Sequence, residues 1–259
     1  MNWNKAKNYL IIALAILNIF LVISIFNHNN NVSIDNIYFS KKSMADFQTM
    51  LDRKNVKITT QIPTDVYNTG TVNVEYQTIN AYAYPLLFEE YDGKINVNSL
   101  KKLVINNSDI LIEDTVNAEN FANRFISRYL SDYTYELRNY TKENGIITFF
   151  YNPIYDGFAY EESELRFVFS PEGMKIVMIV MRPLDVSATS TNVITSVEAI
   201  LKAFPSMKEN TVISKIDFIY YFDTVLAEDL YKVKNARAFP CWRLITSDNE
   251  LFYVPALEN

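Results

Sequence analysis

The longest apolar stretch of the chain lies close to its N-terminus. Residues 9–26 contain no charged residue, no proline and no glycine, and their only polar side chains are those of Asn18 and Ser24. In a helix, these eighteen residues would extend about 27 Å, which is close to the hydrocarbon thickness of a bilayer. The pattern therefore predicts a single transmembrane helix over 9–26.

The residues that flank this stretch predict its orientation. Lys5 and Lys7 precede it and the next basic residue is Lys41, so the positive-inside rule gives a cytoplasmic tail over 1–8 and places the rest outside. A cleaved signal peptide would have a shorter apolar core and a small-x-small site directly after it, and no Ala-x-Ala follows here. We therefore expect an uncleaved, single-pass protein of the cell membrane, with a polar spacer over 27–33 and an extracellular C-terminal domain.

Three later segments carry apolar residues at helical spacing. They predict helices over 43–55, 117–130 and 196–204. The last of these follows a capping box, Thr195-Ser196-Val197-Glu198, and Pro205 should end it.

Other segments alternate apolar and polar positions, the pattern of half-buried strands. Residues 82–91 are apolar and aromatic and carry Pro85, which predicts an edge or irregular strand. The remaining predicted strands lie at 56–62, 72–78, 133–140, 146–151, 165–181 (a hairpin turning at 170–173), 212–222, 242–246 and 251–254, the last two as a hairpin.

Short strands with a few isolated helices, spaced too closely for β-α-β units, indicate an α+β fold. We expect antiparallel sheets packed with a few helices. Strand-and-helix units occur twice, and residues 107–117 between them are polar. The sequence therefore predicts two similar lobes, over 34–112 and 113–259.

Charge limits the partners of the predicted extracellular part. All 30 acidic residues follow the span, against 22 of the 24 basic ones, because only Lys5 and Lys7 precede it. An acidic surface repels phosphates, so we exclude nucleic acid and anionic headgroups as charge-driven partners of this part. Contact with the lipid bilayer is expected through the anchor alone.

The counts of histidine and cysteine limit the chemistry. The only histidine, His28, lies at the exit of the predicted span, which excludes Ser-His-Asp, Cys-His and histidine-based zinc sites from the folded part. The lone Cys241 permits no internal disulfide and is expected to be a buried structural thiol. We predict no catalytic residue, metal site or cofactor, although a hydrolase using two carboxylates stays open as an alternative.

Two further features have simpler structural interpretations. Glu161, Glu162 and Glu164 are expected to form a solvated strand face, with a metal site as the alternative. The 17 phenylalanines and 18 tyrosines include possible stacking platforms for sugars, but aromatic residues at strand periodicity are more typical of sheet packing.

The two ends of the chain resemble one family. The start, Trp3-Asn4-Lys5-Ala6-Lys7, and a span containing Leu17-Asn18 look like the YycI family, single-span proteins of low-GC Gram-positive bacteria. The runs Phe239–Leu244 and Leu251–Ala256 are similar to the family's Pro-x-Trp strand and the strand after it, and also look like the ending of a PepSY-type unit. The chain departs from the pattern at Arg182-Pro183, where the family has glutamine-rich strand endings.

The resemblance implies a regulatory, non-enzymatic function. YycI proteins, together with a YycH partner, associate with the WalK sensor histidine kinase and regulate cell-wall metabolism, largely through transmembrane helices. The resemblance supplies no catalytic residue. The alternative is an extracytoplasmic PepSY-like binding module that inhibits a protease or senses a wall ligand.

One face of the predicted span is the candidate partner-binding site. An asparagine in hydrocarbon seeks a hydrogen-bond partner on another helix, worth about 0.6–2 kcal/mol, and a small residue permits close helix approach. Alternatively, the Asn18 amide is satisfied within its own helix or by water. The face consists of Ile11, Ala15, Asn18, Val22 and Ile25.

Overall fold

The computed structural model describes residues 41–65, 67–186, 191–221 and 235–257. The predicted membrane span lies outside them. Within the described residues, no helix combines the length and the apolar character needed to cross a membrane. The chain divides into two compact units, residues 1–53 and 54–259.

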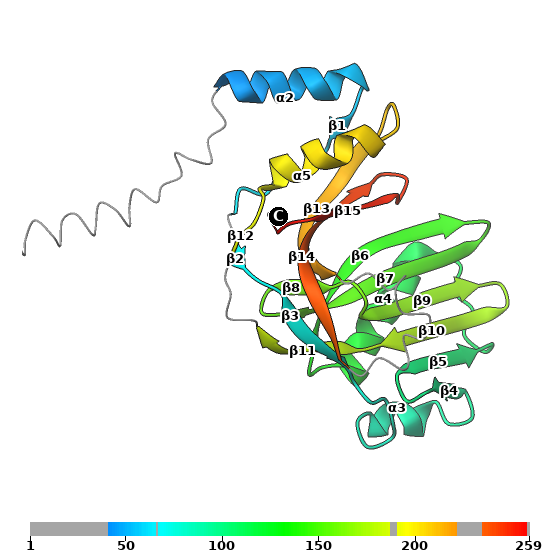
Figure 1. Cartoon of the computed structure of the whole chain (residues 1–259). Coiled ribbons are helices and arrows are strands. Elements are labelled where there is room, and N and C mark those ends of the chain that lie inside the picture. The colour runs from blue at the N-terminus through cyan, green and yellow to red at the C-terminus, as the bar shows by residue number, and fades with distance from the viewer. Residues whose placement is uncertain (1–40, 66, 187–190, 222–234, 258–259) are drawn as a thin grey trace, which may run out of the picture. The chain divides into compact units, whose positions relative to one another are not determined.

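The first unit contains α2 (Lys41–Arg53), which confirms the helix predicted at 43–55. The second unit holds all other described elements (Figure 1). They are β1 (Lys57–Ile58), β2 (Asn68–Thr69), β3 (Val72–Tyr76), α3 (Pro85–Glu90), β4 (Ile95–Asn98), β5 (Lys102–Asn107), α4 (Thr115–Tyr129), β6 (Thr134–Glu143), β7 (Ile146–Tyr155), β8 (Phe158–Tyr160), β9 (Glu164–Ser170), β10 (Gly173–Ile179), β11 (Met181–Val186), β12 (Thr191–Asn192), α5 (Ser196–Ala203), η2 (Phe204–Ser206), β13 (Val212–Tyr221), β14 (Asn235–Thr246) and β15 (Leu251–Pro255).

Most strands of the second unit join one mixed sheet. Its hydrogen-bonded path runs β11-β3-β14-β13-β8-β7-β9-β10-β5-β4, with β1 added to β13, β15 to β14 and β6 to β7. Among the described strands, β1 with β13 and β8 with β13 are the parallel pairs. The predicted α+β class is therefore confirmed, with a largely antiparallel sheet.

Helix α4 covers one face of this sheet beside β7 and β9 (Figure 1). Its buried residues Ala118, Ala122 and Phe125 belong to the main core, and the Phe125 ring meets that of Phe167 on β9 edge-on at 5.3 Å. The helix starts before the predicted residue 117 because Asp114 accepts a hydrogen bond from the Asn117 amide at 2.8 Å, which caps the first turn.

Helix α5 follows the predicted capping box. The Thr195 amide donates to the Glu198 carboxylate at 2.7 Å, and the Glu198 amide donates back to the Thr195 hydroxyl at 3.2 Å. The helix packs against β14 and β15, whose pairing confirms the predicted C-terminal hairpin.

The prediction for residues 82–91 is wrong, because they contain the helix α3. Asn80 accepts hydrogen bonds from the amides of Tyr82 and Ala83, both at 3.0 Å, which turns the chain ahead of the helix. Pro85 occupies the first helical position, where its missing N–H has no cost. The predicted strand at 56–62 is likewise shorter, limited to β1.

The predicted lobes, 34–112 and 113–259, stay a prediction. Strands from both ranges share the hydrogen-bonded path: β5 pairs with β10, and β3 pairs with β14. The path therefore joins early and late parts of the chain at two places.

Candidate functional site

A buried arginine lies in the middle of the sheet. Arg243 on β14 has a side chain that is only 2% exposed. Its cross-strand neighbours are Asp217 on β13 and Tyr253 on β15, and directly paired residues project from the same face of a sheet. The register of three strands therefore places a cation, a carboxylate and a phenol together.

The Arg243 guanidinium uses both of its terminal nitrogens. Nη2 donates to Asp217 Oδ2 at 2.8 Å, and Nη1 donates to Asn152 Oδ1 at 2.8 Å and to a carboxylate oxygen of Glu161. Glu161 follows β8, and the parallel pairing of β8 with β13 brings it alongside β14. These hydrogen bonds offset much of the desolvation cost of a buried charge.

The pairing continues on both sides of Arg243. Glu161 also accepts from Arg138 on β6, and Asp217 lies 3.4 Å from Lys215 Nζ, which donates to Glu136 at 2.8 Å. We call the resulting series the ion-pair chain. In order, it consists of Arg138, Glu161, Arg243, Asp217, Lys215 and Glu136.

The ion-pair chain ties β6 to β13 and β14. Strand β6 pairs with β7, and within the described strands it forms no backbone ladder with β13. Side chains therefore make a connection that the backbone pairing leaves out. Asn139 on β6 adds a hydrogen bond to Asn249, next to β15, at 3.0 Å.

Electrostatics keep Arg243 charged. Burial by itself lowers its pKa, but the carboxylates of Glu161 and Asp217 outweigh this effect and raise the pKa above its ordinary value. Burial also raises the pKa of Tyr253, and the Glu161 carboxylate raises it further by accepting the Tyr253 hydroxyl at 2.7 Å. Arg243 and Tyr253, two of the partners of Glu161, thus hold their protons.

The interpretation of the acidic cluster as a solvated strand face is wrong for Glu161. Its side chain is 8% exposed, because Arg138, Arg243 and Tyr253 surround it. Glu164 is more exposed and pairs with Arg166 on the same strand at 3.0 Å. Within the described residues, no group of histidine, cysteine or acidic side chains has the geometry of a metal site.

Two cavities border the ion-pair chain. One, of about 370 Å³, is lined by Arg138, Phe150, Glu161 and Arg166, among others. The Phe150 ring lies under both guanidinium groups, with centroid distances of 4.7 Å to Arg138 and 5.9 Å to Arg166. The other, of about 210 Å³, contains Tyr67, Asp217 and Arg243, and we call it the Tyr67 cavity.

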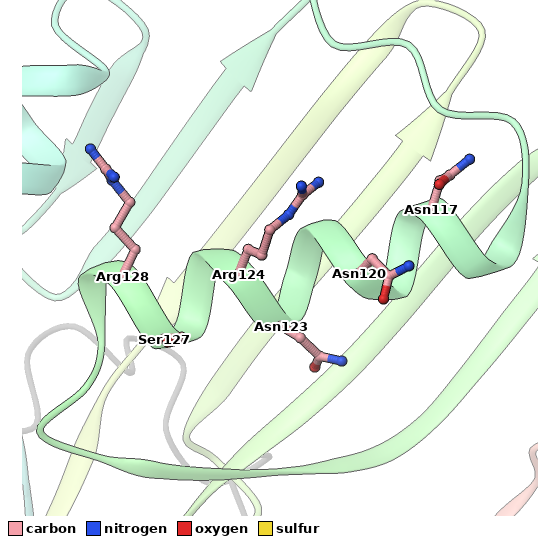
Figure 2. Close-up of a pocket in the computed structure, with 6 residues that line it drawn as sticks. All are labelled: Asn117, Asn120, Asn123, Arg124, Ser127 and Arg128. Atoms are coloured by element: carbon pink, nitrogen blue, oxygen red, sulfur yellow. The ribbon is translucent and has the colours of Figure 1, made fainter.

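A third hollow, of about 640 Å³, runs along the outer face of α4. Figure 2 shows Asn117, Arg124 and Arg128 on one side of the helix and Asn123 on the other. Arg128 is paired with Glu90, and every residue that lines the hollow is exposed. A shallow polar surface of this kind is typical of a solvated helix face.

Cys241, the only cysteine, is buried as predicted. Burial raises the pKa of its thiol to about 12, and the charge of Glu161 adds to the rise. A raised pKa lowers the thiolate fraction at every pH below it.

We therefore expect iodoacetamide at neutral to mildly alkaline pH to alkylate Cys241 in the native protein at least about a hundredfold more slowly than in the urea-unfolded protein. Alkylation of free N-acetylcysteine with and without urea gives the correction for the effect of urea on the reaction. Equal corrected rates for the native and the unfolded protein would contradict the buried position of Cys241.

The candidate partner-binding residues Ile11, Ala15, Asn18, Val22 and Ile25 lie outside the described part of the chain. Sequence reasoning missed the ion-pair chain. The signal that could have shown it was a single arginine inside the apolar run 240–245, since an arginine in a central strand is rarely buried without a partner.

No protein-family model matches the chain, and no curated protein matches it with significant similarity. The resemblance to the YycI family therefore rests on the residues at the two ends of the chain.

Proposed function

We propose that this chain is a membrane-anchored, non-enzymatic regulatory protein that binds a WalK-type sensor histidine kinase and a YycH-type partner. The observation that carries the proposal is the uncharged span 9–26, which follows a Trp-x-Lys-x-Lys start and holds Asn18 on a face with Ala15. A helix of this kind can act as both anchor and contact surface. The extracellular domain then lies where it can respond to the cell wall.

Two structural features support a binding rather than a catalytic domain. The family-like run 239–244 lies in the middle of the sheet, with Pro240 and Trp242 buried, so its sequence serves packing. The charges of the ion-pair chain satisfy one another, and the largely buried carboxylates of Glu161 and Asp217 already accept hydrogen bonds from Arg243. General acids and bases usually need a carboxyl group that is open to substrate.

Affinity capture tests the proposal. The full-length protein is captured from detergent-solubilised membranes of cells that produce it, beside a variant whose residues 9–26 are replaced by an unrelated apolar span. We expect a histidine kinase to be recovered with the native span and lost with the replacement. Recovery of no kinase with either protein would contradict the proposal.

A point variant locates the contact. Asn18→Leu should weaken kinase capture about 3- to 30-fold, because an interhelical hydrogen bond of about 0.6–2 kcal/mol is lost. Ser24→Leu is the matched control, since it removes the other polar side chain of the span, which lies off the predicted face. Equal effects of the two variants would show that Asn18 has no partner.

A second candidate is a PepSY-like binding module that inhibits a protease or senses a wall ligand. The observation that favours it is the C-terminal unit, in which α5 packs against β14 and β15 and leads into β13. Capture of the same partner with both the native and the replaced span would support this candidate.

A further inference from the structure

Strand β4 ends the hydrogen-bonded path of the sheet (Figure 1), and among the described strands only β5 pairs with it. The Asn106 amide on β5 donates to the Lys94 carbonyl at 3.1 Å, so the main chain of Lys94, just before β4, faces β5. Alternate residues of a strand direct their N–H and C=O groups to opposite sides, so the main chain of Asn96 also faces β5. The main-chain groups of Ile95 and Val97 therefore point away from the sheet, along its outer edge.

The edge of β4 lacks the features that protect three other outer strands. Proteins hinder pairing at a sheet edge with proline, with charged side chains and with bulges. Proline occurs in β11 as Pro183 and in β15 as Pro255, and the Lys215 ammonium occupies the Leu137 carbonyl of β6 at 3.2 Å. The sequence of β4, Ile-Asn-Val-Asn, contains neither a proline nor a charge. Of these four strands, β4 is therefore the most open to pairing with a further strand.

The outward groups of β4 are complementary to those of a second β4. When two copies meet antiparallel about a twofold axis at Asn96, Ile95 of each copy lies opposite Val97 of the other. All of these residues direct their main-chain groups outward, so the two strands form about four hydrogen bonds. A twofold axis makes both copies use the same surface, as most homodimers do.

Other registers of the same pair are less favourable. A shift by one residue sets outward groups against groups that already bind β5. A shift by two residues brings either Gly93 or Ser99 opposite the strand, and their φ values of 71° and 51° depart from extended backbone. The register centred on Asn96 is therefore the one that uses all outward groups of β4.

The side chains of β4 fit this register as well. Ile95 and Val97 are half-buried and pack against the main core, whereas Asn96 and Asn98 are exposed on the other face. In the antiparallel pair, apolar side chains of one copy lie beside apolar side chains of the other. The two Asn96 amides face each other, and each can both donate and accept a hydrogen bond. No charge on either strand opposes the contact.

We propose that β4 pairs with β4 of a second copy of this chain, which joins two sheets into one. Each copy contributes four residues, which is small beside the roughly 20–30 residues a side of a stable interface. The contact is therefore expected where copies are concentrated, as on a shared membrane. The proposal goes beyond kinase binding, because neither candidate function requires a second copy or excludes one.

Disulfide trapping tests the pairing. Cells that produce full-length Asn96→Cys are treated with copper phenanthroline, and dimers are separated on a non-reducing gel. The native thiol of Cys241 is buried, so it adds little background. The proposed register places the Cα atoms of the two introduced cysteines about 4.5 Å apart, within the roughly 4.4–6.8 Å that a disulfide spans. We expect a covalent dimer that a reductant dissolves.

Asn98→Cys is the matched control, because Asn98 is exposed on the same face of the same strand. Its two copies would lie about 13 Å apart along the strands, too far for a disulfide. We expect Asn98→Cys to give at most about a tenth of the dimer that Asn96→Cys gives. Equal amounts of dimer from the two variants would overturn the proposal, as would a cross-link of Asn96→Cys to a different protein instead of a second copy.

A second substitution tests the main-chain hydrogen bonds. Adding Val97→Pro to Asn96→Cys removes an outward N–H and leaves the bonds between β4 and β5 in place. The amount of trapped dimer should fall at least about fivefold, because two of the intermolecular hydrogen bonds are lost. Circular dichroism of the purified variant checks its folding. Undiminished dimer from the folded variant would overturn the proposed pairing of edges.

Discussion

Replacing Arg243 with methionine should lower the free energy of unfolding by about 3–5 kcal/mol. The substitution keeps most of the side-chain volume but leaves the Glu161 and Asp217 carboxylates without the cation that they share. Both carboxylates lie in a part of the sheet with little access to water, because their side chains are 8% and 19% exposed. Urea unfolding of the full-length protein in micelles, followed by circular dichroism, measures the change.

Two comparisons separate this effect from a general loss of charge. Lys208→Met removes an exposed pair with Glu250, in which the lysine side chain is 74% exposed, and should cost at most about 1 kcal/mol. Adding Asp217→Asn to Arg243→Met should recover part of the lost free energy of unfolding, because it removes the charge of one carboxylate that has lost Arg243 as its partner. An Arg243→Met variant no less stable than Lys208→Met would show that the ion-pair chain contributes little.

Replacing Trp242 with alanine should also cost about 3–5 kcal/mol, the usual range for a fully buried tryptophan. Its side chain is completely buried, and its ring lies 5.1 Å from that of Phe218 and 5.9 Å from that of Tyr67. Its indole N–H donates to the Ile194 carbonyl at 2.8 Å, just before α5. The substitution therefore removes packing between β13 and β14. It also removes the hydrogen bond to Ile194, in the segment that leads into α5. The same urea titration gives the change.

The control for this variant lies on the same strand. Phe239 is 44% exposed, so Phe239→Ala should change stability by no more than about 0.5 kcal/mol. Trp242→Phe should fall between the two, because it keeps an aromatic ring but leaves the Ile194 carbonyl without its donor. A Trp242→Ala protein as stable as Phe239→Ala would contradict the central position of this residue.

Helices and hairpins with local signals could be predicted from the sequence. The capping box at Thr195, the turn at 170–173 and the helical spacing of 117–130 each act over a few residues, and each element is present. The helix α3 was missed because Pro85 reads equally well as a strand breaker and as a first helical residue. Strand β4 was missed although it alternates apolar residues with asparagine, because its four residues give only a short signal. Strand β5 was missed because Leu103, Val104 and Ile105 are consecutive apolar residues and do not alternate with polar ones.

The ion-pair chain could not be predicted from local patterns. Arg243 and Glu161 are 82 positions apart in sequence, and only the pairing of β8, β13 and β14 brings them together. An acidic triplet is usually solvated, so the sequence alone favours the exposed interpretation. Whether a carboxylate is buried depends on a partner whose position is a property of the whole sheet.

The place of β14 in the sheet has a consequence for biosynthesis. This strand, residues 235–246, lies between β3 and β13, yet it leaves the ribosome long after β3. Until then, β3 and β13 lack the strand that separates them, and their unpaired edges are open to wrong pairings in the nascent polypeptide. Pairings that span most of a chain also form slowly. This protein is therefore expected to depend on chaperones that keep it from aggregating until translation has delivered the hairpin of β14 and β15.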